Sequence, residues 1–195
     1  MKIVLATWNP DKTGWLTKGF EALGMPVETA DPAECDGCEE DGGTCAENAE
    51  KKAMAVGFRK DAIVIAEDSG LFIDALGGFP GTHTARWAPG DDRDRAALLL
   101  QKLHGNPDRR ARFVSAICLL FPGGEVCMCE GILEGTISHS HRGNPASGYG
   151  AIFELPSGKT IAQIGEEAAA TDDHRRRAMR TARGEITKWT EKHPC

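Results

Sequence analysis

The stretch IVIAEDSGLFIDALGGFPGTHTAR, residues 63–86, decides how this chain is organised. It opens with the apolar run Ile63 to Ala66 and then places Glu67 and Asp68 directly before Ser69-Gly70. A buried strand that ends in acidic residues and a glycine turn is a common way to deliver metal-binding or catalytic carboxylates to a sheet edge. We therefore predict a strand over 63–66, a turn after it, and a working centre at the two carboxylates.

Length and composition bound the class of protein. The 195 residues predict a single domain over 1–195, with room for two lobes and a sizeable core. The net charge of -6 argues against a binder of nucleic-acid duplexes, which usually carries a basic face. The sequence shows neither a signal peptide nor an apolar segment long enough to cross a bilayer, so we expect no membrane association and a cytoplasmic protein.

The cysteines divide into two groups. Cys118, Cys127 and Cys129 lie in strand-like apolar runs, where a reduced thiol packs as a small hydrophobic side chain, and we expect free thiols. The acidic, glycine-rich segment 31–46 holds three more, Cys35, Cys38 and Cys45, with a spacing that can bind zinc. A structural zinc site needs four ligands, and His139 and His141 are the distant candidates. The alternative is a mobile acidic loop.

The N-terminal region reads as a strand, a turn and a helix. Lys2 to Ala6 predicts a short buried strand, Thr7 to Lys12 a turn, and the residues after it a helix with its apolar stripe at Trp15, Leu16, Phe20 and Leu23. This order places free backbone N–H groups and the positive end of a helix beside Lys12, which is an anion site in principle, with phosphate as the usual anion. The alternative is an ordinary strand-to-helix turn with a capping Asn or Asp.

A second helix is predicted from Thr44 to Lys60. Thr44 and Glu47 match a capping box at its start. Glu47 therefore has a structural interpretation as a cap and a functional one as a residue that points toward a metal, and the two do not exclude each other.

The rest of the chain predicts an alternation of strands and helices. We expect strands at 27–30, 113–121, 125–137, 152–155 and 160–164, helices at 91–104 and from about 166 onward, and a hairpin turn at 122–124. The charge run at 172–177 is typical of a solvated helix face.

Taken together, these pieces resemble the inosine triphosphate pyrophosphatase family of nucleotide hydrolases. They occur in family order over nearly the whole chain. The matching pieces are Ala6-Thr7-x-Asn9-x-x-Lys12, Glu47-Asn48-Ala49-x-x-Lys52-Ala53, Glu67-Asp68-Ser69-Gly70-Leu71, Asp74-Ala75-Leu76-Gly77-Gly78-x-Pro80-Gly81, Thr84-Ala85-Arg86, Arg110-Ala111-Arg112-Phe113-Val114, Phe121-Pro122-Gly123-Gly124, Glu130-Gly131, Arg142-Gly143, Gly148-Tyr149, Ile152-Phe153 and His174-Arg175.

The resemblance implies a fold and a reaction. The fold is an elongated α/β structure with a central mixed β-sheet flanked by helices, two lobes, and a nucleotide cleft between them. The reaction is the magnesium-dependent hydrolysis of a nucleoside triphosphate to the monophosphate and pyrophosphate, carried out by a homodimer. The usual substrates of the family are deaminated purine nucleotides such as ITP, dITP and XTP.

The resemblance also implies roles for individual residues. Asp68 corresponds to the general base and to a metal ligand, with Glu47 and Glu67 as further metal ligands. Glu67 stands where the family commonly has Asp, so it keeps the charge and adds a methylene of reach. The implied substrate contacts are Thr7, Trp8, Asn9, Lys12, Lys52, Ser69, Gly70, Arg86, Ser147, Gly148, Tyr149, Gly150, Asp173, His174 and Arg175.

The departures from the family pattern cluster in the part that reads the base. The family commonly has Phe-Gly-Tyr/Trp-Asp-Pro where this chain has Ser147-Gly148-Tyr149-Gly150-Ala151. A usual lysine is replaced by Ala169, and a usual serine by Asp173. Losing a stacking Phe can cost about 1–3 kcal/mol, and a pocket that loses its polar reader loses discrimination.

We therefore expect an altered purine nucleotide substrate or a broad specificity, with Tyr149 able to stack on a base and Asp173 able to accept a hydrogen bond. Three readings of function stay open at this point. They are a pyrophosphatase, a non-catalytic nucleotide-binding or regulatory protein on the same fold, and a zinc-binding interaction module.

Overall fold

The computed structural model describes residues 1–35, 38–165 and 171–193. It divides into two compact units. Unit 1 comprises residues 1–69, 115–131 and 177–195, and unit 2 comprises residues 70–114 and 132–176. In the ranges that the structure describes, no helix is both long and apolar enough to cross a membrane.

One mixed sheet supplies strands to both units. Its order is β2-β1-β3-β5-β6-β7, and β4 pairs with β3 off this path. The strands are β1 (Lys2–Leu5), β2 (Val27–Thr29), β3 (Ala62–Ile73), β4 (Pro80–Gly81), β5 (Arg110–Leu120), β6 (Val126–Ile137) and β7 (Phe153–Glu154). β1 runs parallel to β2 and β3, whereas β4 is antiparallel to β3 and β7 is antiparallel to β6. The predicted α/β fold with a central mixed sheet flanked by helices is confirmed.

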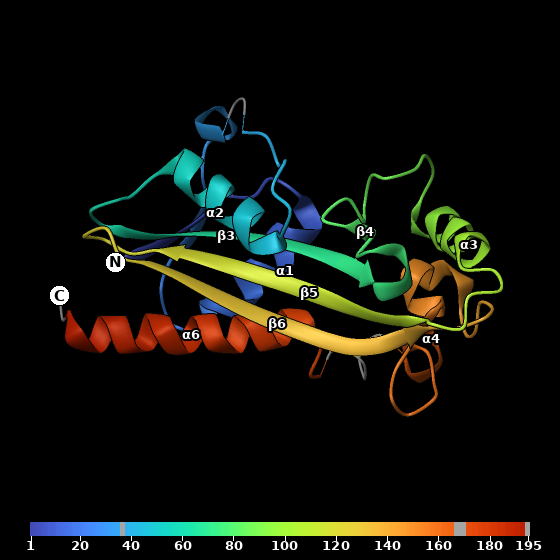
Figure 1. Cartoon of the computed structure of the whole chain (residues 1–195). Coiled ribbons are helices and arrows are strands. Elements are labelled where there is room, and N and C mark those ends of the chain that lie inside the picture. The colour runs from blue at the N-terminus through green and yellow to red at the C-terminus, as the bar shows by residue number, and fades with distance from the viewer. Residues whose placement is uncertain (36–37, 166–170, 194–195) are drawn as a thin grey trace. The chain divides into compact units, whose positions relative to one another are not determined.

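Helices cover both faces of the sheet in unit 1 (Figure 1). α6 (His174–Lys192) lies along one face together with α1 (Pro10–Glu21), and α2 (Cys45–Val56) lies on the other face. A Cβ on Gly19 would come within 2.4 Å of Met179 Cε, so α1 and α6 approach closely here and a larger residue would displace the Met179 side chain.

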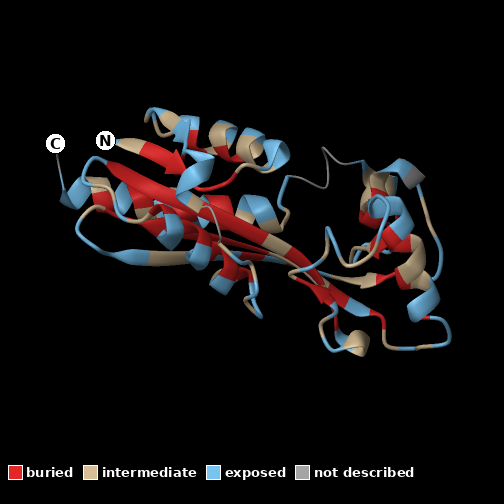
Figure 2. Ribbon diagram, turned by 90° about the horizontal axis from the view of Figure 1, so that it is seen from above, coloured by how far each residue is buried: buried red, intermediate tan, exposed pale blue. Residues whose placement is uncertain are grey.

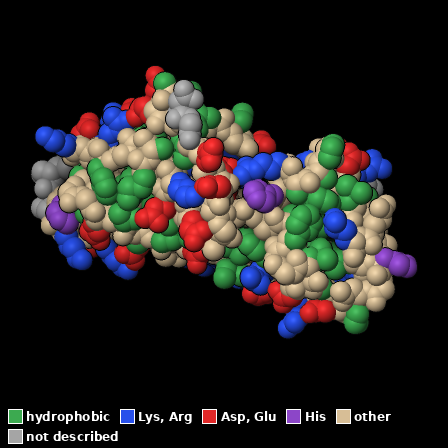
Figure 3. All heavy atoms as spheres, turned by 45° about the horizontal axis from the view of Figure 1, so that its top comes forward, with side chains coloured by type: hydrophobic (Ala, Val, Ile, Leu, Met, Phe, Trp, Pro, Cys, Tyr) green, Lys and Arg blue, Asp and Glu red, His purple; other side chains and the backbone are tan. Residues whose placement is uncertain are grey.

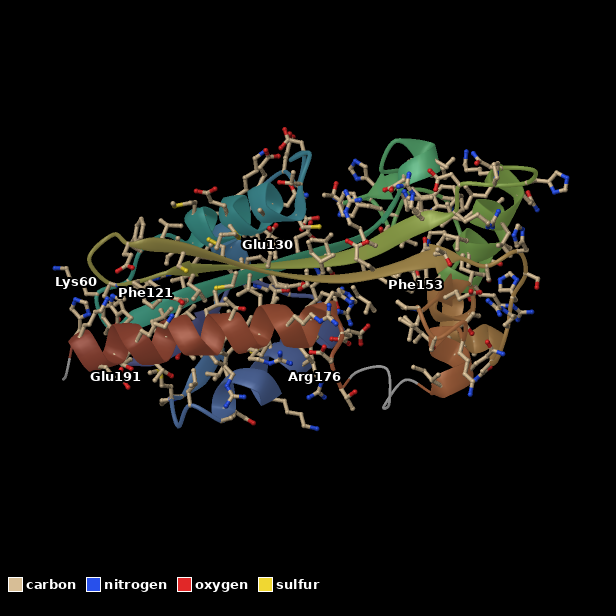
Figure 4. All side chains as sticks on the ribbon, turned by 60° about the horizontal axis from the view of Figure 1, so that its bottom comes forward. Lys60, Phe121, Glu130, Phe153, Arg176 and Glu191 are labelled. Atoms are coloured by element: carbon tan, nitrogen blue, oxygen red, sulfur yellow. The ribbon has the colours of Figure 1, made fainter. Side chains whose placement is uncertain are left out.

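The core of unit 1 is apolar and continuous. Figure 2 shows the strands as the most consistently buried elements and the outward helix faces as exposed. At the far end of β5, Phe121 lies beside α6 and stacks on Trp189 with ring centroids 5.3 Å apart (Figure 4). The buried members of this core are Ile3, Leu5, Leu16, Phe20, Ile63, Ile65, Ile117, Leu119, Phe121, Cys129, Ala178, Met179, Ala182, Ile186 and Trp189.

The prediction of a strand that stops at Ala66 is wrong, because β3 continues to Ile73. Ser69 and Gly70, predicted as a glycine turn, are part of β3, and the next two residues pair with β4, with Leu71 opposite Gly81. A Cβ on Gly70 would meet the Gly81 carbonyl oxygen at 2.3 Å, so this glycine permits close strand contact instead of a turn. Glu67 and Asp68 therefore lie inside a long strand.

The two carboxylates lie beside the end of β1. β1 pairs with β3 only as far as Leu5 and Ile65, two positions before Glu67. Beyond that point the flank of β3 has no β1 partner, and the turn from β1 into α1 takes its place. The sequence predicted that the strand carrying the carboxylates ends at Ala66. In the structure that strand continues, and it is the neighbouring β1 that ends there.

Several other element boundaries differ from the predictions. α2 ends at Val56 instead of Lys60, and Gly57, with a φ of +77°, follows as its cap. Residues 160–164, predicted as a strand, form the short helix α4 (Ile161–Ile164), which Thr160 and Gln163 open with a capping box. β5 begins at Arg110, so the basic cluster before Phe113 belongs to the strand. The predicted start of the last helix near 166 falls partly on residues 166–170, outside the described ranges, and α6 begins at His174.

Among its described residues, unit 2 packs α3 (Asp92–Lys102) and two 3₁₀ segments against its part of the sheet. Asp91 caps α3 with a capping box to Asp94, which confirms the predicted acidic start of this helix. The 3₁₀ segments of the chain are η1 (Pro32–Cys35), in unit 1, and η2 (Asp74–Leu76) and η3 (Pro145–Ala151), in unit 2. The buried core of unit 2 is Leu71, Ile73, Ala96, Leu99, Leu103, Ala111, Leu133, Ile137, Tyr149, Ile152 and Phe153.

Candidate functional site

The turn from β1 into α1 positions the first charged side chain of the site. Asn9 caps α1, because its Oδ1 accepts hydrogen bonds from the backbone N–H groups of Asp11 (2.9 Å) and Lys12 (3.3 Å). Pro10 opens the helix, where its missing N–H costs nothing. The Asn9 side chain thus performs the capping role that the sequence left open as an alternative to an anion site. Lys12, in the first turn, is left with its side chain directed at β3.

Lys12 binds both carboxylates of the central strand. Its Nζ lies 3.0 Å from Glu67 Oε2 and 3.3 Å from Asp68 Oδ1. Burial alone lowers the pKa of Lys12, but the two neighbouring carboxylates outweigh burial and raise the pKa above its ordinary value. Lys12 is therefore a fixed positive charge in this site.

The two carboxylates are held differently. Glu67 has no exposed surface, and Ser115 of β5 donates its Oγ hydrogen to Glu67 Oε1 over 2.8 Å. Asp68 is 5% exposed, and its contacts with Lys12, Asn48 and Lys52 are all longer, between 3.3 and 3.5 Å. Short contacts hold a carboxylate firmly and long contacts are replaced easily. Of the two carboxylates, Asp68 is therefore the one whose present contacts a ligand can replace.

Helix α2 supplies the third side of the cluster. Asn48 and Lys52 stand four residues apart, so they share one face of the helix. Asn48 Nδ2 donates to Asp68 Oδ2 (3.3 Å), and Lys52 Nζ donates to the Glu67 carbonyl oxygen (2.8 Å). Lys52 also pairs with Glu40 at 2.8 Å. These contacts join strand, helix and the acidic segment before the helix into one network in unit 1.

Glu47 caps α2. Its Oε2 accepts from the N–H groups of Gly43 (2.7 Å) and Thr44 (3.2 Å), and Thr44 Oγ1 accepts from the Glu47 N–H (3.1 Å). The predicted capping box is confirmed. The functional interpretation of Glu47 has no support from these contacts, since its carboxylate is turned to its own helix end.

The described residues give no support to a zinc site at the cysteines. Within the described ranges, no three side chains of His, Cys, Asp or Glu gather in a way that could hold a metal ion, and Cys35, Cys38 and Cys45 are all described there. Burial raises the pKa of the Cys35 thiol to about 11 and that of Cys45 to about 12, so both stay protonated at neutral pH. As expected, Cys118, Cys127 and Cys129 are free, with Cys118 and Cys129 buried.

Other residues that the sequence assigned to phosphate contacts lie around this cluster in unit 1. Thr7 is buried, and Trp8 donates its ring N–H to the Ala30 carbonyl oxygen at 3.0 Å. Ser69 is half-buried on β3 directly after Asp68. On the face drawn in Figure 3, basic and acidic side chains of the described residues are interspersed over the surface.

The residues predicted to read the base belong to unit 2, where Tyr149 has an internal role. Its hydroxyl donates to the Thr84 carbonyl oxygen (2.8 Å) and accepts from the Trp87 ring N–H (2.9 Å). The side chain is 5% exposed, and burial raises its pKa to about 12. Its ring packs in the core of unit 2, so stacking on a base would require this core to open.

The segment around Tyr149 is tightly packed. Gly148 has a φ of +53°, and a Cβ there would meet Asp92 Cβ at 2.6 Å, so only glycine fits. Ser147 and Gly150 are half-buried and Arg86 is exposed. These positions contain no carboxylate or large exposed ring, which is the difference that the sequence predicted.

The start of α6 supplies the last predicted contacts. The His174 ring stacks on Phe113 with centroids 5.0 Å apart, and Asp173 Oδ1 accepts from the Arg176 N–H at 2.8 Å. Arg175 is exposed. Ala169 lies outside the described residues.

Sequence reasoning missed three members of the network, namely Glu40, Asn48 and Ser115. Both Asn48 and Ser115 are completely buried, but only Ser115 lies inside an apolar stretch, and its polarity within a predicted strand was the available signal. Glu40 carried no signal, because it is one of several acids in its segment.

Known proteins resemble this chain in sequence over most of its length. Residues 3–184 match the model of the Ham1 family. A dITP/XTP pyrophosphatase from an Exiguobacterium species is 41% identical over 190 residues, which is 95% of this chain and 97% of the relative. A dITP/XTP pyrophosphatase from Thermus thermophilus is 39% identical over 184 residues, covering 92% and 89%.

Solved structures give the same result. The Ham1 protein of Staphylococcus aureus superposes with a TM-score of 0.82 at 33% identity over 96% of this chain and 99% of that one. A HAM1 protein from Coxiella burnetii gives a TM-score of 0.83 at 29% identity with the same coverage.

Proposed function

The chain belongs to the Ham1 family, and we propose that it hydrolyses purine nucleoside triphosphates to the monophosphate and pyrophosphate. The proposed substrates are non-standard purine nucleotides of the ITP, dITP and XTP type, or another purine nucleotide that the altered 147–151 segment admits. The observation that carries this proposal is the cluster in which Lys12 and Lys52 flank Glu67 and Asp68. Relatives named dITP/XTP pyrophosphatases, similar over nearly their full length, support the same reaction.

The cluster suits a polyphosphate. The half-buried ammonium group of Lys12 and the buried one of Lys52 approach one strand, and their contacts with Asp68, 3.3 and 3.5 Å long, are the ones that a phosphate oxygen can replace. In a site with little exposed surface, an ammonium group interacts with phosphate more strongly than it would in water. We assign Lys12 and Lys52 to the triphosphate, where they stabilise the negative charge that develops on the departing pyrophosphate.

The donor set also fits magnesium. Mg²⁺ in phosphoryl-transfer sites is typically held by one or two protein carboxylates together with substrate phosphate oxygens and water. Asp68 provides such a carboxylate, and Glu67 stands next to it. We propose Asp68 as the main ligand, because both oxygens of Glu67 are engaged by Ser115 and Lys12 over shorter distances. When bound, the metal ion would neutralise phosphate charge and polarise the α-phosphorus.

Asp68 is also the proposed general base. It accepts the proton of the water that attacks the α-phosphorus, while Asn48 holds Oδ2 and Lys12 holds Oδ1. The bond to the β-phosphate then breaks and pyrophosphate leaves. Glu47, which the resemblance named as a metal ligand, is proposed here as a cap that sets the start of α2.

The assembly is proposed to be a homodimer, as the family resemblance implies. Light scattering coupled to size-exclusion chromatography measures this directly. A mass of twice 21.0 kDa is the expected result.

The test of function is a panel of standard and non-standard purine nucleoside and deoxynucleoside triphosphates assayed with magnesium. Pyrophosphate and inorganic phosphate are measured separately. Pyrophosphate release in equal amount to the monophosphate is the expected result. Release of inorganic phosphate alone would contradict a pyrophosphatase, and nucleotide binding without any turnover would favour a non-catalytic nucleotide-binding protein.

A further inference from the structure

Ser115 is a polar residue in an apolar stretch. The five residues that follow it on β5, Ala116 to Leu120, are completely buried and apolar, and Ser115 itself has no exposed surface. Its hydroxyl donates to Glu67 Oε1 at 2.8 Å. A buried hydroxyl that meets a buried carboxylate forms a charge-assisted hydrogen bond, which is roughly twice as strong as one between neutral groups.

The Glu67 carboxylate contacts Ser115 with one oxygen and Lys12 with the other. With Oε1 held by Ser115, the other oxygen, Oε2, lies 3.0 Å from Lys12 Nζ. The same ammonium group reaches Asp68 Oδ1 at 3.3 Å. Lys12 is thus shared between one oxygen of each carboxylate.

We infer that Ser115 is a positioning residue that acts through Glu67 to hold the Lys12 ammonium group between Glu67 and Asp68. This inference rests on the proposed function, in which Lys12 binds the triphosphate and the pyrophosphate product. Ser115 occupies Oε1, and that leaves Glu67 a single oxygen for Lys12. Without the hydroxyl, the buried, charged Oε1 atom has one hydrogen-bond donor fewer, which is unfavourable.

In the Ser115→Ala variant, the position of the Lys12 ammonium group is expected to change. Lys12 can satisfy both oxygens of Glu67 if it moves toward that carboxylate and away from Asp68. The ammonium group is then withdrawn from the phosphate that it is proposed to bind. Replacing a side chain that hydrogen-bonds to a metal ligand typically costs about 10–100-fold in metal affinity or activity. Glu67 is a candidate ligand of this kind, and we expect about tenfold here, because the charges themselves remain.

The experiment compares Ser115→Ala, Ser115→Thr and Ser115→Cys with wild type. Thr keeps the hydroxyl donor, whereas Cys fills nearly the same volume but donates only weakly. The matched control is Ser138→Ala. Ser138 is also a buried serine, and its hydroxyl donates to the Ser140 carbonyl oxygen at 2.7 Å, away from the carboxylates. Two quantities are measured, the affinity for inorganic pyrophosphate with magnesium by calorimetry and kcat with KM for the best nucleotide of the panel.

Ser115→Ala should lower kcat and weaken pyrophosphate binding, each by about tenfold, whereas Ser115→Thr should stay within about threefold of wild type. Ser115→Cys should fall between the two, and Ser138→Ala should match wild type in both measurements. A residue that only fills space would give a Cys variant equal to wild type. That result, or an Ala variant with unchanged pyrophosphate affinity and kcat, would overturn the inference.

A double-mutant cycle provides the second test. Glu67→Gln removes the charge through which Ser115 acts, so adding Ser115→Ala to it should cost less than about twofold more, since residues in one network are not additive. Full additivity of the two losses would show that Ser115 acts elsewhere.

The proposed function fails separately from this inference. A wild-type chain that binds pyrophosphate but cleaves no nucleotide would overturn the proposed function, and the Ser115 series would still be read from pyrophosphate binding. A wild-type chain that binds no pyrophosphate would overturn both.

Discussion

The charged cluster of unit 1 and the 147–151 segment of unit 2 hold their side chains by opposite means. In the cluster, Lys12, Lys52, Glu67 and Asp68 depend on one another for charge balance, so the removal of any one leaves another charged group with one partner fewer. In the 147–151 segment, glycine, alanine and serine are held by close packing, and the hydroxyl of Tyr149 is used inside the unit.

The difference shows how one chain can keep a reaction while its specificity changes. A network of buried charges tolerates few substitutions, because its members share their partners. A packed segment of small residues with few polar side chains directed at a ligand can be rewritten at small cost in stability. The following predictions test that contrast, beginning with the largest effect.

Asp68→Asn should reduce kcat by about three orders of magnitude, because the amide cannot accept the proton of the attacking water and general-base catalysis supplies 10²–10⁴-fold. Its shape is kept, so the fold should persist. Steady-state kinetics with the best nucleotide measures the effect, and circular dichroism checks the fold. A variant that turns over at the wild-type rate would remove Asp68 from the proposed chemistry.

The double substitution Ser147→Phe with Gly150→Asp should restore a family-like segment and shift selectivity. A Cβ at Gly150 would lie 3.3 Å from Ser147 Cβ and 3.4 Å from Ile161 Cγ2, so a side chain fits after a small adjustment. We expect a gain of about tenfold in the ratio of kcat/KM for XTP or ITP over dGTP, with hydrolysis itself retained, because base stacking is worth about 1–3 kcal/mol.

The competing result for this pair is informative too. If wild type already prefers ITP or XTP strongly over dGTP and dATP, the segment is not the source of altered selectivity. The charged cluster and the 147–151 segment would then differ in how their side chains are held, but the segment would not explain which nucleotide is preferred.

Tyr149→Phe should lower stability without changing the choice of nucleotide. It removes the hydroxyl that bridges Trp87 and Thr84 and leaves a buried N–H and a buried carbonyl group with one partner fewer. The expected loss is about 1–3 kcal/mol in the free energy of unfolding. Urea denaturation measures it. A change in nucleotide preference with unchanged stability would instead place Tyr149 in contact with the base.

Glu47→Gln should have the smallest effect. Gln completes a capping box as Glu does, so we expect the stability to change by less than about 0.5 kcal/mol and kcat to stay within about twofold. The magnesium concentration for half-maximal activity is measured alongside. A strong rise in that concentration would identify Glu47 as a metal ligand and weaken the assignment made from its cap contacts.

Much of the fold followed from local sequence patterns. β1, the turn into α1, the capping box at Thr44, the helix that begins near Asp91, and the 122–124 hairpin were all predicted, because each depends on residues close together in the chain. The strand after Asp68 was not, since its continuation depends on pairing with β4 ten residues farther along. The short helix α4 was missed for a related reason, as four residues carry too little periodicity to separate a helix from a strand.

The sequence by itself determined which chemical groups this protein carries: two adjacent carboxylates, two lysines at characteristic spacing, and a segment of small residues where a base reader is usual. Tertiary structure alone decided which of them meet. Ser115 lies 48 positions from Glu67, and Lys12 lies 56 positions from Asp68. Such contacts arise only when β1 stops short beside β3 and β5 pairs on its other side, because the energy of a buried charge depends on its neighbours in space and not on those in the chain.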